Sequence, residues 1–198
     1  MKKHLNSVLA IGLLLALSFT AVGQSGKAFY NTPYKSRNNG TFDKGTNLFS
    51  IGLGLPSRYT YDYDFGNGNI AFPALYLKYE HGILDELGLG GYVAVTGSRY
   101  KHGNHVDRRT YLNFSILAYY HFNKIIPVKN LDVYAGAGGG VRHRIYHDGS
   151  TDQTSGESRP VFVGKVGARY YFTPSFGVYA EAGTDGMSDV NAGITFRF

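Results

Sequence analysis

The chain has 198 residues, a formal net charge of +6 and no cysteine, which excludes disulfide scaffolds, thiolate metal sites and cysteine nucleophiles. Only 17% of the residues are charged, the mean hydropathy is -0.21, and the chain holds 27 glycines, 17 tyrosines and 13 phenylalanines. These values argue against a helical membrane protein and against a disordered polyelectrolyte.

The N-terminal residues 1–23 have the pattern of a secretory signal peptide. Lys2 and Lys3 form a basic start, residues 8–17 are an uninterrupted run of small or apolar residues, and residues 21–23 are small. The run is shorter than the roughly 20 apolar residues that cross a bilayer. We therefore predict cleavage after residue 23 and export from the cytoplasm, with a short buried helix or a retained anchor as the alternative.

Two segments of different character follow. Residues 24–44 are polar and show no sustained period, so we predict a flexible N-terminal segment. Residues 45–198 alternate between two faces, as strands do, and have no run of 18 apolar residues that could form a transmembrane helix. The alternation predicts eight strands, near residues 49–55, 75–80, 87–96, 111–122, 131–142, 162–172, 176–183 and 190–198.

The strand count and the connections favour a closed antiparallel barrel, which leaves no strand edge to aggregate. The predicted connections are residues 56–69, 82–86, 98–109, 123–130, 147–160, 173–175 and 184–189. Membrane barrels of bacteria have short periplasmic turns and longer outer loops, so the first, third, fifth and seventh connections are assigned outside. The fourth is long for a periplasmic turn and the seventh is short for an outer loop. The first is expected to extend two strands as a hairpin.

The distribution of charge decides which face lines the barrel. Seven charged side chains share one face with most of the glycines: Lys78, Glu80, Arg142, Lys165, Arg169, Glu181 and Arg197. In a narrow lumen, small residues give room to side chains from the opposite wall, and acids can pair with bases. The sequence thus predicts an all-β, eight-stranded, antiparallel up-and-down transmembrane β-barrel, with the lumen plugged by this charge network.

Aromatic residues gather at the predicted periplasmic ends of the apolar face. The predicted girdle consists of Phe49, Tyr79, Phe122, Phe172, Phe176, Phe196 and Phe198. Aromatics at one level mark a membrane interface. A soluble sandwich or a soluble ligand-binding barrel, in which these rings are core, remains the alternative fold.

Three segments resemble the small eight-stranded barrels of the OmpA/OmpX-like outer membrane protein beta-barrel domain family. They are the terminal strand VNAGITFRF, the segment PALYLKYEHGI and the strand GLGGYVAV that follows it. The resemblance covers residues 45–198 and implies insertion into the outer membrane of a Gram-negative bacterium. It also implies that Phe196 and Phe198 form a signal for the barrel-assembly machinery. It does not imply one activity.

Catalytic and metal sites are hard to assemble from these residues. Ser98 with His102 or His105, and Ser115 with His121, are conceivable nucleophile–base pairs, yet none has a recognisable motif. The loop histidines His102, His105, His143 and His147 have spacings that could ligate a metal, but no carboxylate or cysteine completes a set. We expect no catalytic residue, no cofactor and no metal. A lipid-modifying hydrolase or acyltransferase at the rim is the alternative function.

The predicted outer region is basic. Its cations are Arg58, Arg99, Lys101, Arg108, Arg109, Arg142, Arg144 and Arg159, and its acids are Asp62, Asp64, Asp107, Asp148, Asp152 and Glu157. Guanidinium groups bind phosphates, so we expect contact with lipopolysaccharide, or alternatively plain solvation. Outer-membrane lipid, lipopolysaccharide and the assembly machinery are the expected partners, nucleic acid is not, and the chain is expected to be a monomer. The predicted function is a structural or surface-interaction role.

Overall fold

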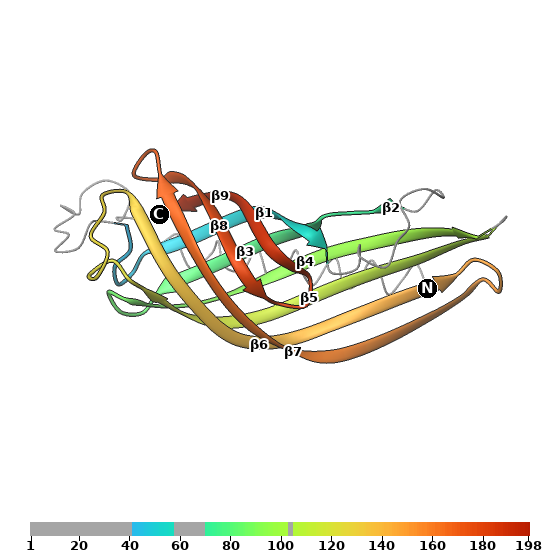
Figure 1. The fold of residues 1–198 in the computed structure, drawn as a ribbon. Helices are drawn as coiled ribbons and strands as arrows, with labels where there is room; N and C mark the ends of the chain where they lie inside the picture. The colour runs from blue at the N-terminus through green and yellow to red at the C-terminus, as the bar shows by residue number, and fades with distance from the viewer. Residues whose placement is uncertain (1–40, 58–69, 103–104) are drawn as a thin grey trace, which may run out of the picture. The chain divides into compact units, whose positions relative to one another are not determined.

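The computed structural model describes residues 41–57, 70–102 and 105–198 (Figure 1). The predicted signal peptide, most of the predicted flexible segment and residues 58–69 of the first outer hairpin lie outside the described residues. No helix in the described part of the chain is long and apolar enough to cross a membrane.

The described residues form an all-antiparallel barrel. Its strands are β1 (Asn47–Ser57), β2 (Ile70–Ala71), β3 (Ala74–Gly82), β4 (Leu87–His102), β5 (His105–His121), β6 (Leu131–Asp148), β7 (Gln153–Tyr171), β8 (Phe176–Thr184) and β9 (Ser188–Arg197). Strands β2 and β3 both pair with β4 and together form one interrupted strand of the barrel, so the barrel has eight strands. Pairing of β4 with β5 and of β1 with β9 leaves the barrel closed. The predicted eight-stranded antiparallel barrel is confirmed.

The last residue takes part in this closure. The backbone N–H of Phe198 donates to the carbonyl of Asn47 at 3.0 Å, and the N–H of Asn47 donates back at 2.9 Å. The C-terminus is thereby fixed to the start of β1.

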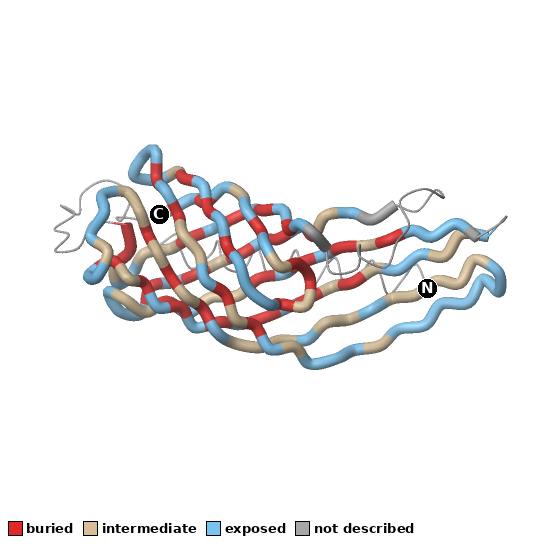
Figure 2. Tube along the Cα trace, viewed as in Figure 1, coloured by how far each residue is buried: buried red, intermediate tan, exposed pale blue. Residues whose placement is uncertain are grey.

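The two faces of each strand have opposite surroundings (Figure 2). In β3, for example, Tyr76 is fully buried in the lumen whereas its neighbours Leu75 and Leu77 are about half exposed on the outside. The same alternation holds in β5, where buried Asn113 and Ser115 flank exposed Phe114. A polar interior and an apolar exterior are the arrangement of a transmembrane barrel and the reverse of a soluble one.

Strands β4–β7 are longer than predicted and project as one sheet beyond β1, β3, β8 and β9, with β2 paired to β4 at Ser98 and Arg99 (Figure 1). Residues 98–109 and 147–160 were predicted to be loops, yet most of the described ones are strand, and residues 149–152 form a turn between β6 and β7. The physical reason is that both faces of this projecting sheet meet water. Apolar alternation, the signal that marks a strand in a sequence, is therefore lost there.

Inward glycines make room for lumen tyrosines. A Cβ atom added at Gly52 would lie 2.0 Å from the hydroxyl of Tyr179, and one added at Gly136 would lie 2.7 Å from the ring of Tyr119. A side chain at either position would displace a buried ring, so the narrow lumen requires glycine there.

Candidate functional site

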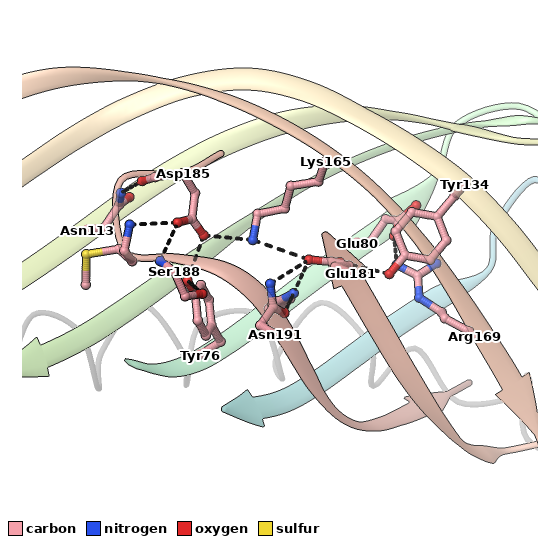
Figure 3. Close-up of polar contacts among 12 residues, drawn as sticks. Tyr76, Glu80, Asn113, Tyr134, Lys165, Arg169, Glu181, Asp185, Ser188 and Asn191 are labelled. Carbon is pink, nitrogen blue, oxygen red and sulfur yellow. Dashed lines mark hydrogen bonds and ion pairs between the residues drawn. The ribbon is translucent and has the colours of Figure 1, made fainter. Parts of the chain in front are cut away.

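A chain of ion pairs runs through the lumen (Figure 3). Glu181 on β8 accepts from Lys78 at 2.5 Å and lies 3.3 Å from Lys165. Lys165 in turn lies 2.8 Å from Asp185, which also accepts from the hydroxyl of Tyr76 at 2.7 Å. All four charged side chains are at least 93% buried. Each charge has an opposite partner, which a buried charge requires.

A second cluster lies nearer the predicted periplasmic end. Arg169 on β7 donates to Glu80 at 2.6 Å and to Asp132 at 3.0 Å. Between the same two carboxylates lies His121, whose Nε2 is 2.6 Å from Glu80 and whose Nδ1 is 2.8 Å from Asp132. Ionised carboxylates only accept hydrogen bonds, so the ring donates from both nitrogens and is an imidazolium. The two clusters together then hold four cations and four anions.

The seven lumen charges predicted from the sequence do not form a single network. Five of the seven (Lys78, Glu80, Lys165, Arg169 and Glu181) lie in the two clusters. Arg142 instead donates to the carbonyl of Gly186 at 3.1 Å, at the outer end. Arg197 donates to the carbonyls of Pro174 and Thr41, at the other end.

Three members of the clusters were missed. Asp132 and His121 follow the inward alternation of their strands, and this alternation could have found them. Asp185 lies in the turn between β8 and β9, where no strand period applies. Only the fold shows that this turn bends inward: Asp185 and Met187 are fully buried, and Asn113 donates to the backbone carbonyl of Asp185 at 2.9 Å.

Both ends of the lumen are covered by the chain itself. The turn Asp185–Ser188 covers the outer end, which explains why this connection is shorter than an outer loop usually is. At the other end Phe42 is fully buried and its ring stacks on His121. Phe42 belongs to the segment that we predicted to be flexible, and residues 41–44 of that segment pack against the barrel.

The predicted girdle residues lie on the outward face near one end of the barrel. Phe49 faces Tyr79 on one side and Phe196 on the other, and Phe196 faces Phe176. This row of four rings crosses β3, β1, β9 and β8. Phe122 packs on Tyr120, Phe172 packs on Tyr170, and Phe198 ends the chain beside Asn47.

The conceivable nucleophile–base pairs are not assembled in the described residues. The hydroxyl of Ser115 donates to Asn113 at 2.6 Å, and both nitrogens of His121 face carboxylates. Ser98 is buried, whereas His105 lies at the projecting tip against the carbonyl of Gly149. The side chain of His102 lies outside the described residues.

The loop histidines pair with hydroxyls across the β6–β7 hairpin. His143 lies 2.8 Å from Ser158, and His147 lies 3.1 Å from Thr154. Among the described side chains, no group of three or more potential ligands suited to a metal ion is found.

The basic residues of the projecting sheet separate onto two faces. The alternation of β4 and β5 places Arg99, Lys101 and Arg108 on the outward face, and Arg99 is directly opposite Arg108. Next to Arg108 in the same row is His147. The inward face carries Arg109, Arg142, Arg144 and Arg159. Arg58, Asp62 and Asp64 lie outside the described residues.

Carboxylates of this sheet have shifted pKa values. Hydrogen bonds from the side chain and backbone of Ser150 lower the pKa of Asp148 to about 2. A hydrogen bond from Arg159, with the nearby charges of Arg144 and Arg142, lowers the pKa of Glu157. Both carboxylates are therefore ionised at neutral pH.

No protein-family model and no curated protein matches this sequence. Solved structures with a similar fold do exist. The attachment invasion locus protein Ail of Yersinia pestis, solved with the heparin analogue sucrose octasulfate, is 16% identical, with a TM-score of 0.50, over 78% of this chain and 99% of that chain. This chain has the fold of an outer-membrane barrel.

Two Pseudomonas aeruginosa structures also match. The N-terminal β-barrel domain of OprF is 17% identical over 79% of this chain and 99% of that one, with a TM-score of 0.43. The outer membrane protein OprG is 13% identical over 79% and 97%, with a TM-score of 0.44.

The apolar exterior of a closed barrel, together with the fold shared with Ail, places the chain in a bacterial outer membrane, as predicted. The outward apolar residues of β5, together with Phe122, which follows the strand, run from Phe122 to Leu112. At about 3.4 Å per residue and the usual tilt, this run matches the roughly 25 Å height of a membrane barrel's apolar band. Arg108 lies on the same face just beyond the band, at the level where lipid headgroups begin.

Proposed function

We propose that this chain is a structural, surface-interacting barrel of the outer membrane whose outward basic residues bind lipopolysaccharide phosphates. The observation that carries the proposal is the row of Arg99, Arg108 and His147 across β4, β5 and β6. Like charges directly opposite each other destabilise a sheet, so an anion that lies between Arg99 and Arg108 would relieve the repulsion.

The position of this row supports a lipid-linked anion. Arg99 and Arg108 are exposed on the outward face, four residues beyond the apolar residues Val95 and Leu112 of the same strands. A phosphate on a surrounding lipid can therefore reach both guanidinium groups from the side. Ail, a barrel of the same fold, was solved with a polyanionic ligand, which is a further reason to test anions.

The experiment compares the barrel in vesicles with and without lipopolysaccharide. We expect lipopolysaccharide to raise the melting temperature of the wild-type barrel, and the Arg99→Gln/Arg108→Gln variant to lose most of this increase. Arg109→Gln is the matched control, because Arg109 is adjacent in β5 but lies on the inward face against the ring of Tyr146. The proposal would be contradicted if both variants lost the same part of the increase in melting temperature. It would also be contradicted if lipid A without phosphates raised the melting temperature of the wild type as much as lipopolysaccharide does.

The same proposal includes a lumen that does not conduct ions. The two ion-pair clusters, the turn Asp185–Ser188 and Phe42 fill its length. An eight-stranded barrel has an interior just wide enough for side chains. Recordings across planar bilayers should show no stable conductance steps, and reproducible steps would refute this part.

A further inference from the structure

We propose that the inward face of the projecting sheet contains a second anion site, a cleft that binds one phosphate or sulfate ester group from the external solution. Five side chains line it: Tyr111, Arg142, Arg144, Glu157 and Arg159. They come from β5, β6 and β7, three neighbouring strands of the projecting sheet. The site is distinct from the outward row of the proposed function.

Strand register brings these side chains together. Arg142 is directly opposite Arg159, Arg144 is directly opposite Glu157, and Tyr111 is the partner of Arg144 on the other side. The cleft has a volume of about 90 Å³. A single water needs only about 10–15 Å³ of such volume, so the cleft has room for a tetrahedral oxyanion.

The charges of the cleft favour an anion. Three guanidinium groups surround one carboxylate, which leaves an excess of two positive charges, and Arg142 directly faces Arg159. Glu157 accepts from Nη2 of Arg144 at 2.9 Å and from Nε of Arg159 at 2.7 Å. Each guanidinium has five N–H donors, so both arginines keep donor capacity for a second acceptor. Arginine forks match the geometry of phosphate and sulfate oxygens.

The direction in which the cleft opens decides the source of the anion. All five side chains lie on the face that continues the lumen wall, whereas lipids surround the outward face. Strand β8 ends at Thr184, opposite Gly164, so β7 beyond that point has no β8 neighbour to cover the cleft. Below it, the bond from Arg142 to the carbonyl of Gly186 joins the cleft to the turn that covers the lumen. A ligand therefore enters from the external solution.

The effect of removing Glu157 on anion affinity distinguishes a binding site from a purely structural cluster. In the unliganded cleft this carboxylate is the counter-ion of Arg144 and Arg159, and it competes with an incoming anion for the same donors. Its removal should therefore strengthen anion binding. If the five residues only stabilised the sheet, removal of Glu157 would leave anion binding absent or unchanged.

The test is calorimetric titration of the full barrel in detergent micelles with inorganic phosphate and with inorganic sulfate. We expect measurable binding by the wild type, a loss of about tenfold or more in Arg144→Gln/Arg159→Gln, and a gain of several-fold in Glu157→Gln. Tyr111→Phe keeps the charges and should change affinity by less than the double variant. Lys124→Gln removes one positive charge outside both proposed sites, at the pair with Glu86, and is the control that should bind as the wild type does.

The proposal would be overturned by absence of binding in the wild type, or by unchanged or weaker binding in Glu157→Gln. Heat-modifiable migration in gels shows whether each variant is folded. If Arg144→Gln/Arg159→Gln does not fold, Arg159→Lys takes its place: it keeps the positive charge but loses the guanidinium donors, and should also weaken binding. The lipopolysaccharide assay separates the two sites, because Arg144→Gln/Arg159→Gln should keep the wild-type increase in melting temperature. A joint loss in both assays would contradict the assignment of two separate sites.

Discussion

The ring of Phe42 lies flat on the imidazole of His121, with ring centroids 3.5 Å apart and an angle of 9° between the planes. His121 is held between Glu80 and Asp132, so the aromatic face of Phe42 covers a positively charged ring. Through this contact a residue ahead of the first strand closes one end of the charged lumen.

Replacement of Phe42 should therefore destabilise the barrel. We expect Phe42→Ala to lower the free energy of unfolding by about 3 kcal/mol or more, the usual cost of removing a fully buried phenylalanine side chain. Phe42→Leu should cost less, since it keeps burial and loses only the stacking on His121. Urea unfolding in vesicles measures both values. Phe172→Ala, at a position 60% exposed on the outward face, is the control, and an equal cost there would contradict a special role for Phe42.

Substitution of Gly52 by alanine should be destabilising because two neighbours occupy the space. The new Cβ would meet the hydroxyl of Tyr179 and the backbone carbonyl of Ala192, and overpacking of this kind costs about 1–3 kcal/mol. Tyr179→Leu should recover part of the loss, with a coupling of at least about 0.5 kcal/mol in a double-mutant cycle. Gly164→Ala is the matched control, since nothing lies within 4 Å of its added Cβ. Additive effects of the Gly52 and Tyr179 changes would disprove the proposed clash.

Removal of one buried lysine should cost far more than removal of an exposed one. Lys78→Met removes the lysine that lies 2.5 Å from Glu181 and leaves Lys165 as its other cation, and breaking a buried pair costs about 3–5 kcal/mol. Lys124→Met breaks the pair with Glu86, in which the lysine side chain is half exposed, and should cost less than about 1 kcal/mol. The chain has no tryptophan, so circular dichroism and tyrosine fluorescence follow unfolding. Similar costs for the two variants would show that the lumen pair is not desolvated.

The stability of the turn at Asp148 should depend on pH between about 4 and about 2. The pKa of Asp148 is lowered from 3.8 to about 2 because Ser150 donates to its carboxylate. A lowered pKa means that the carboxylate stabilises the turn at pH values above about 4, and that this contribution is lost as the pH falls through about 2. Titration of the carboxyl signal by NMR in micelles measures the midpoint. A midpoint near 3.8 would show that the hydrogen bonds to Ser150 are absent in solution.

Much of the barrel could be predicted because a membrane-spanning strand has two unlike environments. Leu75, Leu77 and Tyr79 alternate with Tyr76, Lys78 and Glu80, and the structure places the first set outside and the second inside. Lipid and lumen impose this alternation residue by residue. Beyond the membrane both faces meet water, so the outer halves of β4–β7 were predicted to be loops.

The candidate sites were less predictable, because each depends on contacts between distant strands. The sequence indicated that the outer region is basic, but it did not separate Arg108 from Arg109, which lie on opposite faces of one strand. It also did not bring Arg142, Arg144 and Arg159 to one cleft, since that requires the register of β6 with β7.

The sequence by itself determined the number of membrane-spanning strands and, within the apolar band, the face on which each side chain lies, because a period of two is a local property. Only the tertiary structure decided that Asp185 turns inward to meet Lys165, that Phe42 covers His121, and that five of the seven predicted lumen charges form two clusters. These contacts join residues far apart in the chain, and their geometry is fixed by strand stagger and barrel closure.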